Sequence, residues 1–169
     1  MKTRRVSHLI ATVVVAVSMA SLTSAAVASD IEISLEVKSA KQRVSANRTE
    51  EAPSPQKAAA RPVFTGKAGE DLVVSWKVTN VGKQDTFKDV LIHCVVVAEK
   101  EPGQATVPDL KDAVQESALT MDFAPGGSAT GEFSLSIDQP GAYLVRVETL
   151  NMRDAHGHEH YAALDLVRK

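Results

Sequence analysis

The chain has 169 residues, of which 44% are hydrophobic and 24% charged, with a formal net charge of −2. This near-neutral balance, without a basic stripe, argues against a protein that binds nucleic acid or an anionic membrane. A single cysteine, Cys94, excludes an internal disulfide, so packing alone must hold the domain together. Because Cys94 lies in the apolar run 90–97, we expect a buried, inert thiol.

The N-terminus has the pattern of a secretory signal. Lys2, Arg4 and Arg5 precede an apolar segment at 9–22, and the small residues at 26–28 supply a cleavage pattern. The segment is shorter than the roughly 20 residues that a membrane span needs, which disfavours a retained single-pass anchor. We therefore expect residues 1–28 to be removed, leaving a secreted or periplasmic protein without membrane insertion. The export route, general secretory or twin-arginine, stays open.

The next stretch predicts a first strand and then a long connection. Apolar and polar residues alternate over 30–37, which is the pattern of a half-buried strand. Residues at about 39–61 are polar and contain Pro53 and Pro55. Such a composition predicts a flexible, exposed connection.

Further strands are predicted at regular spacing after residue 62. Over 72–78, the residues Leu72, Val74, Trp76 and Val78 fall on one face, and Trp76 is interpreted as a core residue. Residues 89–98 are apolar on both faces, which favours an interior strand. The one helix-like segment is 109–118, with Asp109 as its cap. Other strands are predicted at 119–123, 129–137, 143–150 and 160–167.

Together these elements predict a single all-β domain over residues 29–169. Seven or eight short strands with one short helical insertion are typical of an antiparallel β-sandwich. A sandwich supports many unrelated functions, so the fold alone does not assign one.

Three turn motifs carry a resemblance to a known group. Val78-Thr-Asn-Val-Gly82, Ala124-Pro-Gly-Gly-Ser128 and Pro140-Gly-Ala-Tyr143 resemble the turns of bacterial immunoglobulin-like modules of the cell-adhesion-related (CARDB-like) group. The resemblance implies an immunoglobulin-like sandwich with an accessory or adhesion-like role. This chain lacks the inter-sheet disulfide of true immunoglobulin domains.

The motif residues also suggest particular conformations. Asn80 and Gly82 suit a turn with positive φ. Tyr143 suits a tyrosine corner, in which the phenol bonds to a nearby backbone group.

One cluster of metal-ligating residue types lies near the C-terminus. On an extended strand His158 and His160 point the same way, at a spacing that one Zn²⁺ or Cu²⁺ ion can bridge. His156 and Asp154 could complete the coordination shell, and Met152 could bind reduced copper. The alternatives are a solvated hairpin tip with His160 facing inward, or a pH-responsive or partner-binding role.

Catalytic motifs are not apparent in the sequence. There is no Gly-x-Ser-x-Gly elbow and no phosphate-binding loop, so we predict a protein that is not an enzyme. The first hypothesis is a binding or accessory module whose partner is an unknown protein or glycan of the cell envelope. The second is an extracytoplasmic copper or zinc protein. A third, a polysaccharide-binding accessory domain, is disfavoured because Tyr161 is its only aromatic candidate.

Overall fold

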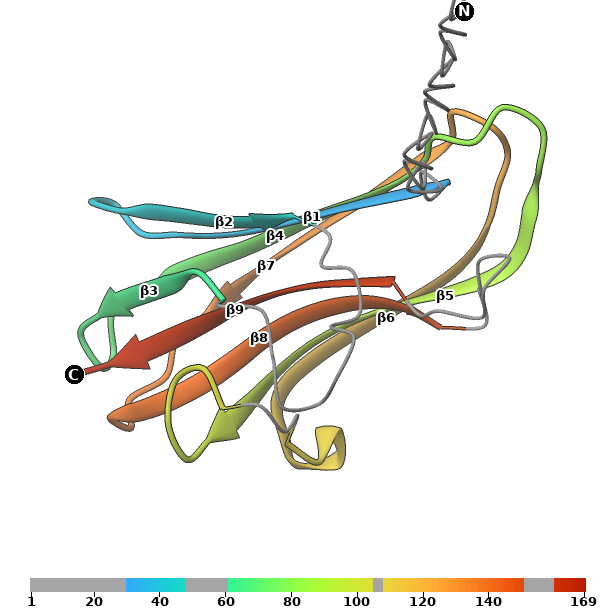
Figure 1. The fold of residues 1–169 in the computed structure, drawn as a ribbon. Helices are drawn as coiled ribbons and strands as arrows, with labels where there is room; N and C mark the ends of the chain where they lie inside the picture. Colours follow the sequence, from blue (N-terminus) through green and yellow to red (C-terminus); the bar gives the residue numbers. More distant parts are fainter. Residues whose placement is uncertain (1–29, 48–60, 105–107, 151–159) are drawn as a thin grey trace, which may run out of the picture.

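The computed structural model describes residues 30–47, 61–104, 108–150 and 160–169, which form two facing β-sheets (Figure 1). The first sheet has the order β2-β1-β4-β7 and the second β3-β9-β8-β5-β6. Neighbouring strands are antiparallel except for β3 and β9, which run parallel. The strands are β1 (Ile31–Lys38), β2 (Arg43–Asn47), β3 (Val63–Gly66), β4 (Leu72–Asn80), β5 (Phe87–Glu99), β6 (Ala113–Phe123), β7 (Ser128–Leu135), β8 (Gly141–Leu150) and β9 (His160–Arg168).

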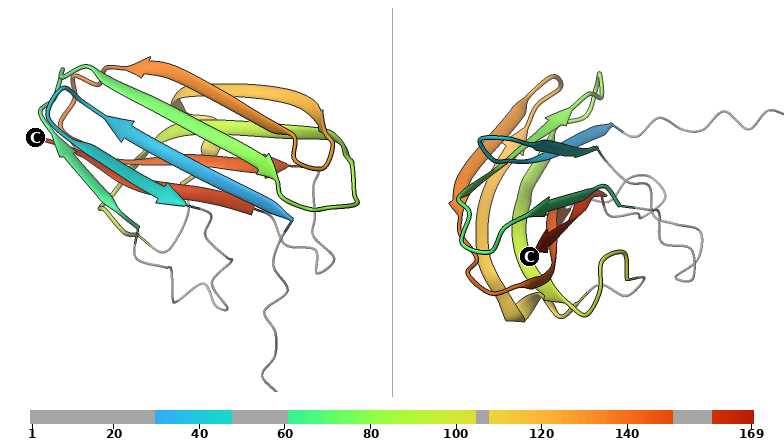
Figure 2. Two further views of the ribbon diagram at one scale, coloured as in Figure 1. Left: turned by 90° about the horizontal axis from the view of Figure 1, so that it is seen from above. Right: turned by 90° about the vertical axis from the view of Figure 1, so that its left-hand side faces the viewer.

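The predicted all-β sandwich is confirmed, and the core fills the space between the two sheets. Figure 2 shows the two layers from above and from one end. Both layers contribute alternate apolar side chains, as the period of two requires. They include Ile33, Leu35, Val74, Val78, Ile92, Val96, Val145, Val147, Leu164 and Leu166, each at most 2% exposed.

Two sequence-based boundaries are wrong. The segment predicted as a helix at 109–118 contains only a 3-10 turn, Leu110–Asp112, before it enters β6. Pairing with β5 overrides the helical spacing of its apolar residues. The predicted connection at 39–61 is interrupted by β2, which pairs with β1 and buries Ala46. Each of these segments is an edge strand that pairs with the strand before it in the chain, and local composition does not record that pairing.

Several single-residue predictions are confirmed. The strand at 89–98 lies inside the sheet, within β5, and Cys94 is fully buried. Burial raises the pKa of the Cys94 thiol to about 12, so it stays protonated and unreactive at neutral pH. The Tyr143 hydroxyl donates a hydrogen bond to the backbone oxygen of Gln139 at 3.1 Å, which completes a tyrosine corner.

Asn80 stabilises the end of β4 differently from the prediction. Neither Asn80 nor Gly82 has a positive φ. Instead, the fully buried Asn80 side chain donates to the backbone oxygens of Asp85 at 2.9 Å and Phe123 at 3.1 Å. Its Oδ1 accepts a hydrogen bond from the Gly82 amide at 2.9 Å. The motif therefore links three chain segments through one side chain rather than through backbone flexibility.

Trp76 is a core residue, as its position in the alternating pattern predicted. Its side chain is 7% exposed and belongs to the main hydrophobic cluster. In the β4–β7 register Trp76 lies opposite Gly131. A Cβ atom on Gly131 would lie 2.3 Å from two ring carbons of Trp76. The indole thus occupies the space that a side chain at position 131 would need.

Candidate functional site

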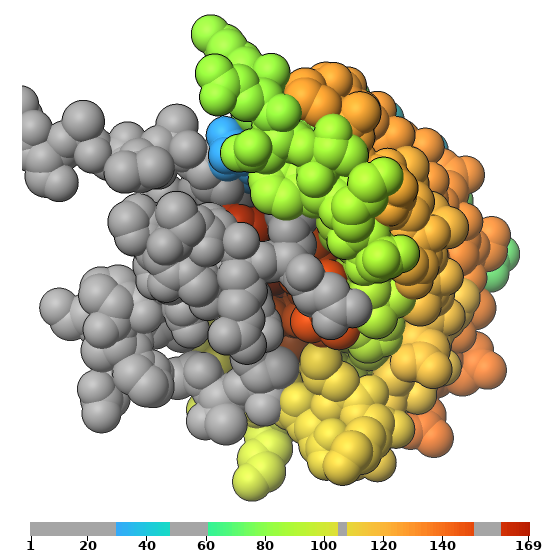
Figure 3. All heavy atoms as spheres, turned by 90° about the vertical axis from the view of Figure 1, so that its right-hand side faces the viewer, coloured from blue at the N-terminus to red at the C-terminus, as the bar shows by residue number. Residues whose placement is uncertain are grey.

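The predicted histidine site falls largely outside the described residues. Met152, Asp154, His156 and His158 all lie there, whereas His160 opens β9. His160 is 4% exposed and shares the core-facing side of β9 with Ala162. The described residues contain no group of three or more His, Cys, Asp or Glu side chains that could hold a metal ion. The copper or zinc site therefore stays a prediction. Figure 3 faces the end of the sandwich where β8 ends and β9 begins.

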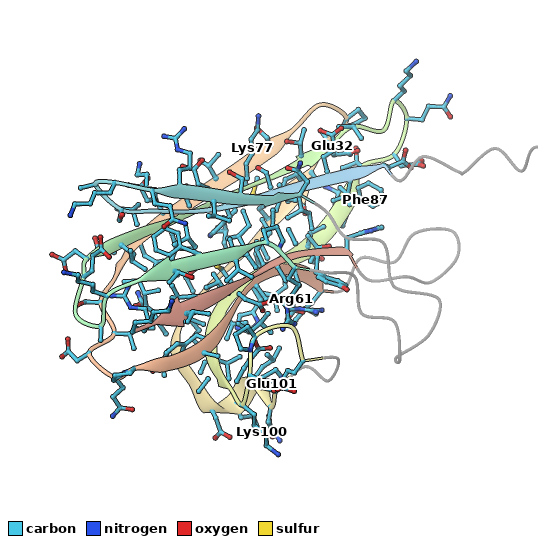
Figure 4. The ribbon with its side chains drawn as sticks, turned by 60° about the vertical axis from the view of Figure 1, so that its left-hand side comes forward. Glu32, Arg61, Lys77, Phe87, Lys100 and Glu101 are labelled. Carbon is cyan, nitrogen blue, oxygen red and sulfur yellow. The ribbon has the colours of Figure 1, made fainter. Side chains whose placement is uncertain are left out.

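A shallow hollow lies on the outer face of the first sheet, where polar residues alternate with the core residues. We call it the polar hollow. Its volume is about 540 Å³, and an adjoining depression of about 480 Å³ extends it toward Glu32 and Thr79. In Figure 4, Glu32 and Lys77 lie on this outer side of the molecule. The polar side chains that line the hollow are Ser34, Glu36, Ser45, Asn47, Ser75, Lys77, Thr130 and Glu132.

Many hydrogen-bonding groups of the polar hollow are unused. Glu36 is held by Arg43 at 3.3 Å and by the Ser45 hydroxyl at 3.4 Å. By contrast, five other polar side chains of the hollow have no side-chain partner among the described residues. They are Ser34, Asn47, Ser75, Lys77 and Thr130. Because four hydrogen-bonded strands fix these groups, a ligand could meet them with little loss of conformational entropy.

The outer face of the second sheet carries an ionic cluster formed by Arg61, Glu99 and Asp165. The guanidinium of Arg61 contacts Glu99 and Asp165, each at 2.7 Å. The Glu99 side chain is fully buried, and its Oε2 has no hydrogen-bond partner within the described part of the chain. The sequence analysis did not predict this pair of carboxylates, Glu99 and Asp165. The fold brings both carboxylates to Arg61, which is 104 positions from Asp165 and 38 positions from Glu99 in the sequence.

A second ionic cluster runs across β6, β5 and β8. Arg146 donates to Glu148 at 2.6 Å, and its guanidinium lies 4.0 Å from the centre of the Tyr161 ring. The other Glu148 oxygen contacts Nδ1 of His93 at 3.2 Å, and Nε2 of His93 contacts Glu116 at 3.3 Å. Both nitrogens of His93 are thus engaged. This arrangement links neighbouring strands and leaves His93 without a free nitrogen for a ligand.

His93, in β5, does not lie next to the last strand, β9, in the sheet. Strand β8 lies between β5 and β9.

The sequence signal that could have revealed the two clusters is the presence of charged residues inside otherwise apolar strands. Arg146 and Glu148 in β8 and Asp165 in β9 are such residues, and all three are buried. Buried charges require partners, so their presence indicates contacts across strands.

The Glu99 cluster predicts a pH-dependent stability. Burial raises the pKa of Glu99 to about 7 despite the opposing charge of Arg61, and nearby Asp165 raises this pKa further. A carboxyl whose pKa is higher in the folded state stabilises the fold when protonated, so stability falls as the pH rises from about 4.5 through 7. We expect a loss of about 2 kcal/mol between pH 5 and 8, allowing for solvent screening.

The substitution Glu99→Gln should remove this loss, because the neutral amide still accepts a hydrogen bond from Arg61 and carries no charge. Urea unfolding at pH 5, 6.5 and 8 measures the effect against the control Glu101→Gln, whose residue is exposed on the following turn. Parallel pH profiles of the wild type and Glu99→Gln would contradict the prediction.

No protein-family model matches this chain, and no curated protein matches it. The resemblance to CARDB-like modules therefore stays a prediction based on three turns. No helix in the described residues is long and apolar enough to cross a membrane.

Proposed function

We propose that this protein is a secreted or periplasmic, non-catalytic binding module that holds a protein or glycan of the cell envelope against its polar hollow. The observation that carries the proposal is a set of side chains on the first sheet that have no side-chain partner among the described residues: Ser34, Asn47, Ser75, Lys77 and Thr130. The signal-like N-terminus supports the extracytoplasmic location.

The chemistry of the hollow fits recognition better than catalysis. The most reactive side-chain types in the described core and sheets are engaged elsewhere, since Cys94 is buried and His93 lies between two carboxylates. Trp76 is among the residues that line the hollow, but it is 7% exposed and packs in the main hydrophobic cluster. Because the described residues include no exposed aromatic ring for stacking on a sugar, hydrogen bonds to a protein segment are favoured over a stacked glycan.

The test is whether filling the hollow prevents binding. In Ser34→Arg/Ser75→Arg two long side chains occupy it, whereas the control Thr120→Arg adds a similar charge to the exposed edge strand β6. Partners captured from an envelope fraction are treated with protease or glycosidase to identify their class, and affinities are then measured by biolayer interferometry. We expect the double variant to bind at least about tenfold more weakly, equivalent to about 1.4 kcal/mol, and the control to bind normally.

Circular dichroism establishes that both variants are folded. Equal affinity of the double variant and wild type for the captured partner would contradict the proposed surface. Repeated capture experiments without any partner would count against a binding module.

A further inference from the structure

Arg168 brings a buried positive charge to one end of the sandwich. Its side chain is on the core-facing side of β9 and is 2% exposed. Nη2 donates to the backbone oxygen of Glu70 at 2.6 Å, but Nε and Nη1 are buried without a hydrogen-bond partner in the described structure. No described carboxylate forms an ion pair with it. A buried charge without a counterion is unfavourable, so an anion nearby would stabilise this end.

A second hollow, of about 580 Å³, opens beside this arginine. We call it the end pocket. It lies between the β1–β2 turn and the β3–β4 turn, which approach each other at the end of the molecule near the C-terminus (Figures 1 and 2). The residues that line it are Ser39, Lys41, Gln42, Thr65, Gly66, Lys67, Glu70 and Lys169.

Gly66 connects the end pocket with the guanidinium. It lines the pocket and pairs in register with Arg168. A Cβ atom on Gly66 would lie 3.0 Å from Nη1 of Arg168 and 2.9 Å from Oε2 of Glu70, so the absence of a side chain there brings both the buried positive charge and the Glu70 carboxylate close to the pocket wall. A ligand bound against Gly66 would interact electrostatically with Arg168 across the protein interior, where charges are poorly screened.

The rim of the end pocket adds more positive charge. Lys41, Lys67 and Lys169 are exposed, and none of their ammonium groups has an ion-pair partner among the described residues. The one carboxylate that lines the pocket is Glu70, which accepts a hydrogen bond from the Lys67 amide at 3.2 Å. Among the described side chains, three lysines at the rim and Arg168 behind the wall thus outnumber the one carboxylate, Glu70.

We propose that the end pocket binds an oxyanion, the phosphate or carboxylate group of a ligand, between Lys41 and Lys67 and against Gly66, above Arg168. Several converging donors suit an oxyanion, because its oxygens can each accept a separate charge-assisted hydrogen bond. The hydroxyls of Ser39 and Thr65 and the amide of Gln42 are further polar groups on the wall. The end pocket shares no lining residue with the polar hollow, so the inference is independent of the proposed function.

The first test is an NMR titration of the whole mature protein with sodium phosphate, sodium acetate and sodium chloride at equal ionic strength. We expect saturable shifts of the Gln42, Gly66 and Lys67 amides with an oxyanion but not with chloride. The phosphate and acetate arms distinguish a phosphate ligand from a carboxylate ligand. Shifts that are absent, unsaturable or equal in chloride would overturn the proposal.

Matched lysine variants locate the site. Lys41→Ala/Lys67→Ala should weaken oxyanion binding at least about fivefold, since two charges are lost. The control Lys83→Ala removes an exposed lysine from the β4–β5 turn and should bind as the wild type does. Unchanged affinity in the double variant would overturn the site.

Arg168→Met tests the buried charge while keeping an unbranched side chain in the core. Without phosphate this variant should be at least as stable as the wild type, because a buried unpaired charge is removed. With phosphate its melting temperature should rise less than that of the wild type. A full phosphate-dependent rise would overturn the role of Arg168. If the variant does not fold, the lysine pair and its control still decide the proposal.

Discussion

Replacing Gly131 by valine should lower the free energy of unfolding by about 3 kcal/mol. The reason is steric, because even the first carbon of the new side chain would lie 2.3 Å from Cε2 and Cζ2 of Trp76. The indole is 7% exposed and packed in the main hydrophobic cluster, so it has little room to move away. Urea unfolding followed by tryptophan fluorescence measures the loss, since Trp76 is the only tryptophan in the chain.

The neighbouring substitution Glu132→Val is the matched control. It places the same β-branched side chain in β7 at an exposed position, where it should change stability by no more than about 0.5 kcal/mol. A double-mutant cycle with Trp76→Leu isolates the cause. If the ring is the obstacle, Gly131→Val should cost less in the Trp76→Leu background. An equal cost in both backgrounds would mean that glycine is needed at position 131 for another reason.

The core strands could be predicted because their signal is local. The alternation through Leu72, Val74, Trp76 and Val78 reports one buried face directly, and the structure buries all four residues. The need for glycine at position 131 could not be predicted in this way, because the sequence does not indicate which distant side chain occupies the space beside a glycine in a strand. Only the register of β4 against β7 places it opposite Trp76.

The candidate binding surfaces could not be predicted from the sequence. The polar hollow combines residues from four strands, and the end pocket combines two turns with the end of the chain. In the sequence, Arg168 has the appearance of an ordinary surface cation. The parallel pairing of β3 with β9 places it behind Gly66. Long-range pairing of strands decides these juxtapositions, whereas periodicity reports only which face of each strand is buried.

The turn motif Val78-Thr-Asn-Val-Gly82 was recognised correctly in the sequence, but its conformation was explained incorrectly. Its asparagine and glycine suggested positive φ, but what the structure shows is a buried side-chain amide that holds the turn through hydrogen bonds. The Asn80 NH₂ group joins the β4–β5 turn, through the Asp85 oxygen, to the end of β6, through the Phe123 oxygen. Since a carboxylate has the shape of this amide but no N–H, substitution at this position separates shape from hydrogen bonding.

Asn80→Asp should therefore lower the free energy of unfolding at pH 7.5 by about 3 to 4 kcal/mol, more than the loss of about 2 kcal/mol expected for Asn80→Ala. The aspartate would keep the acceptor for the Gly82 amide but would place a buried negative oxygen against the carbonyls of Asp85 and Phe123. Both the burial and the two carbonyls favour the protonated acid. The pKa of the new carboxyl should thus be raised in the folded state.

The pH dependence separates this cause from simple loss of packing. A raised folded-state pKa means that stability returns as the pH falls, because the protonated carboxyl can again donate to one carbonyl. Urea unfolding at pH 7.5 and 4.5 should show a smaller deficit for Asn80→Asp at the lower pH, relative to wild type. The deficit of Asn80→Ala, which has no titratable group, should stay constant. Equal deficits of Asn80→Asp at both pH values would show that the two carbonyls do not depend on the Asn80 N–H groups.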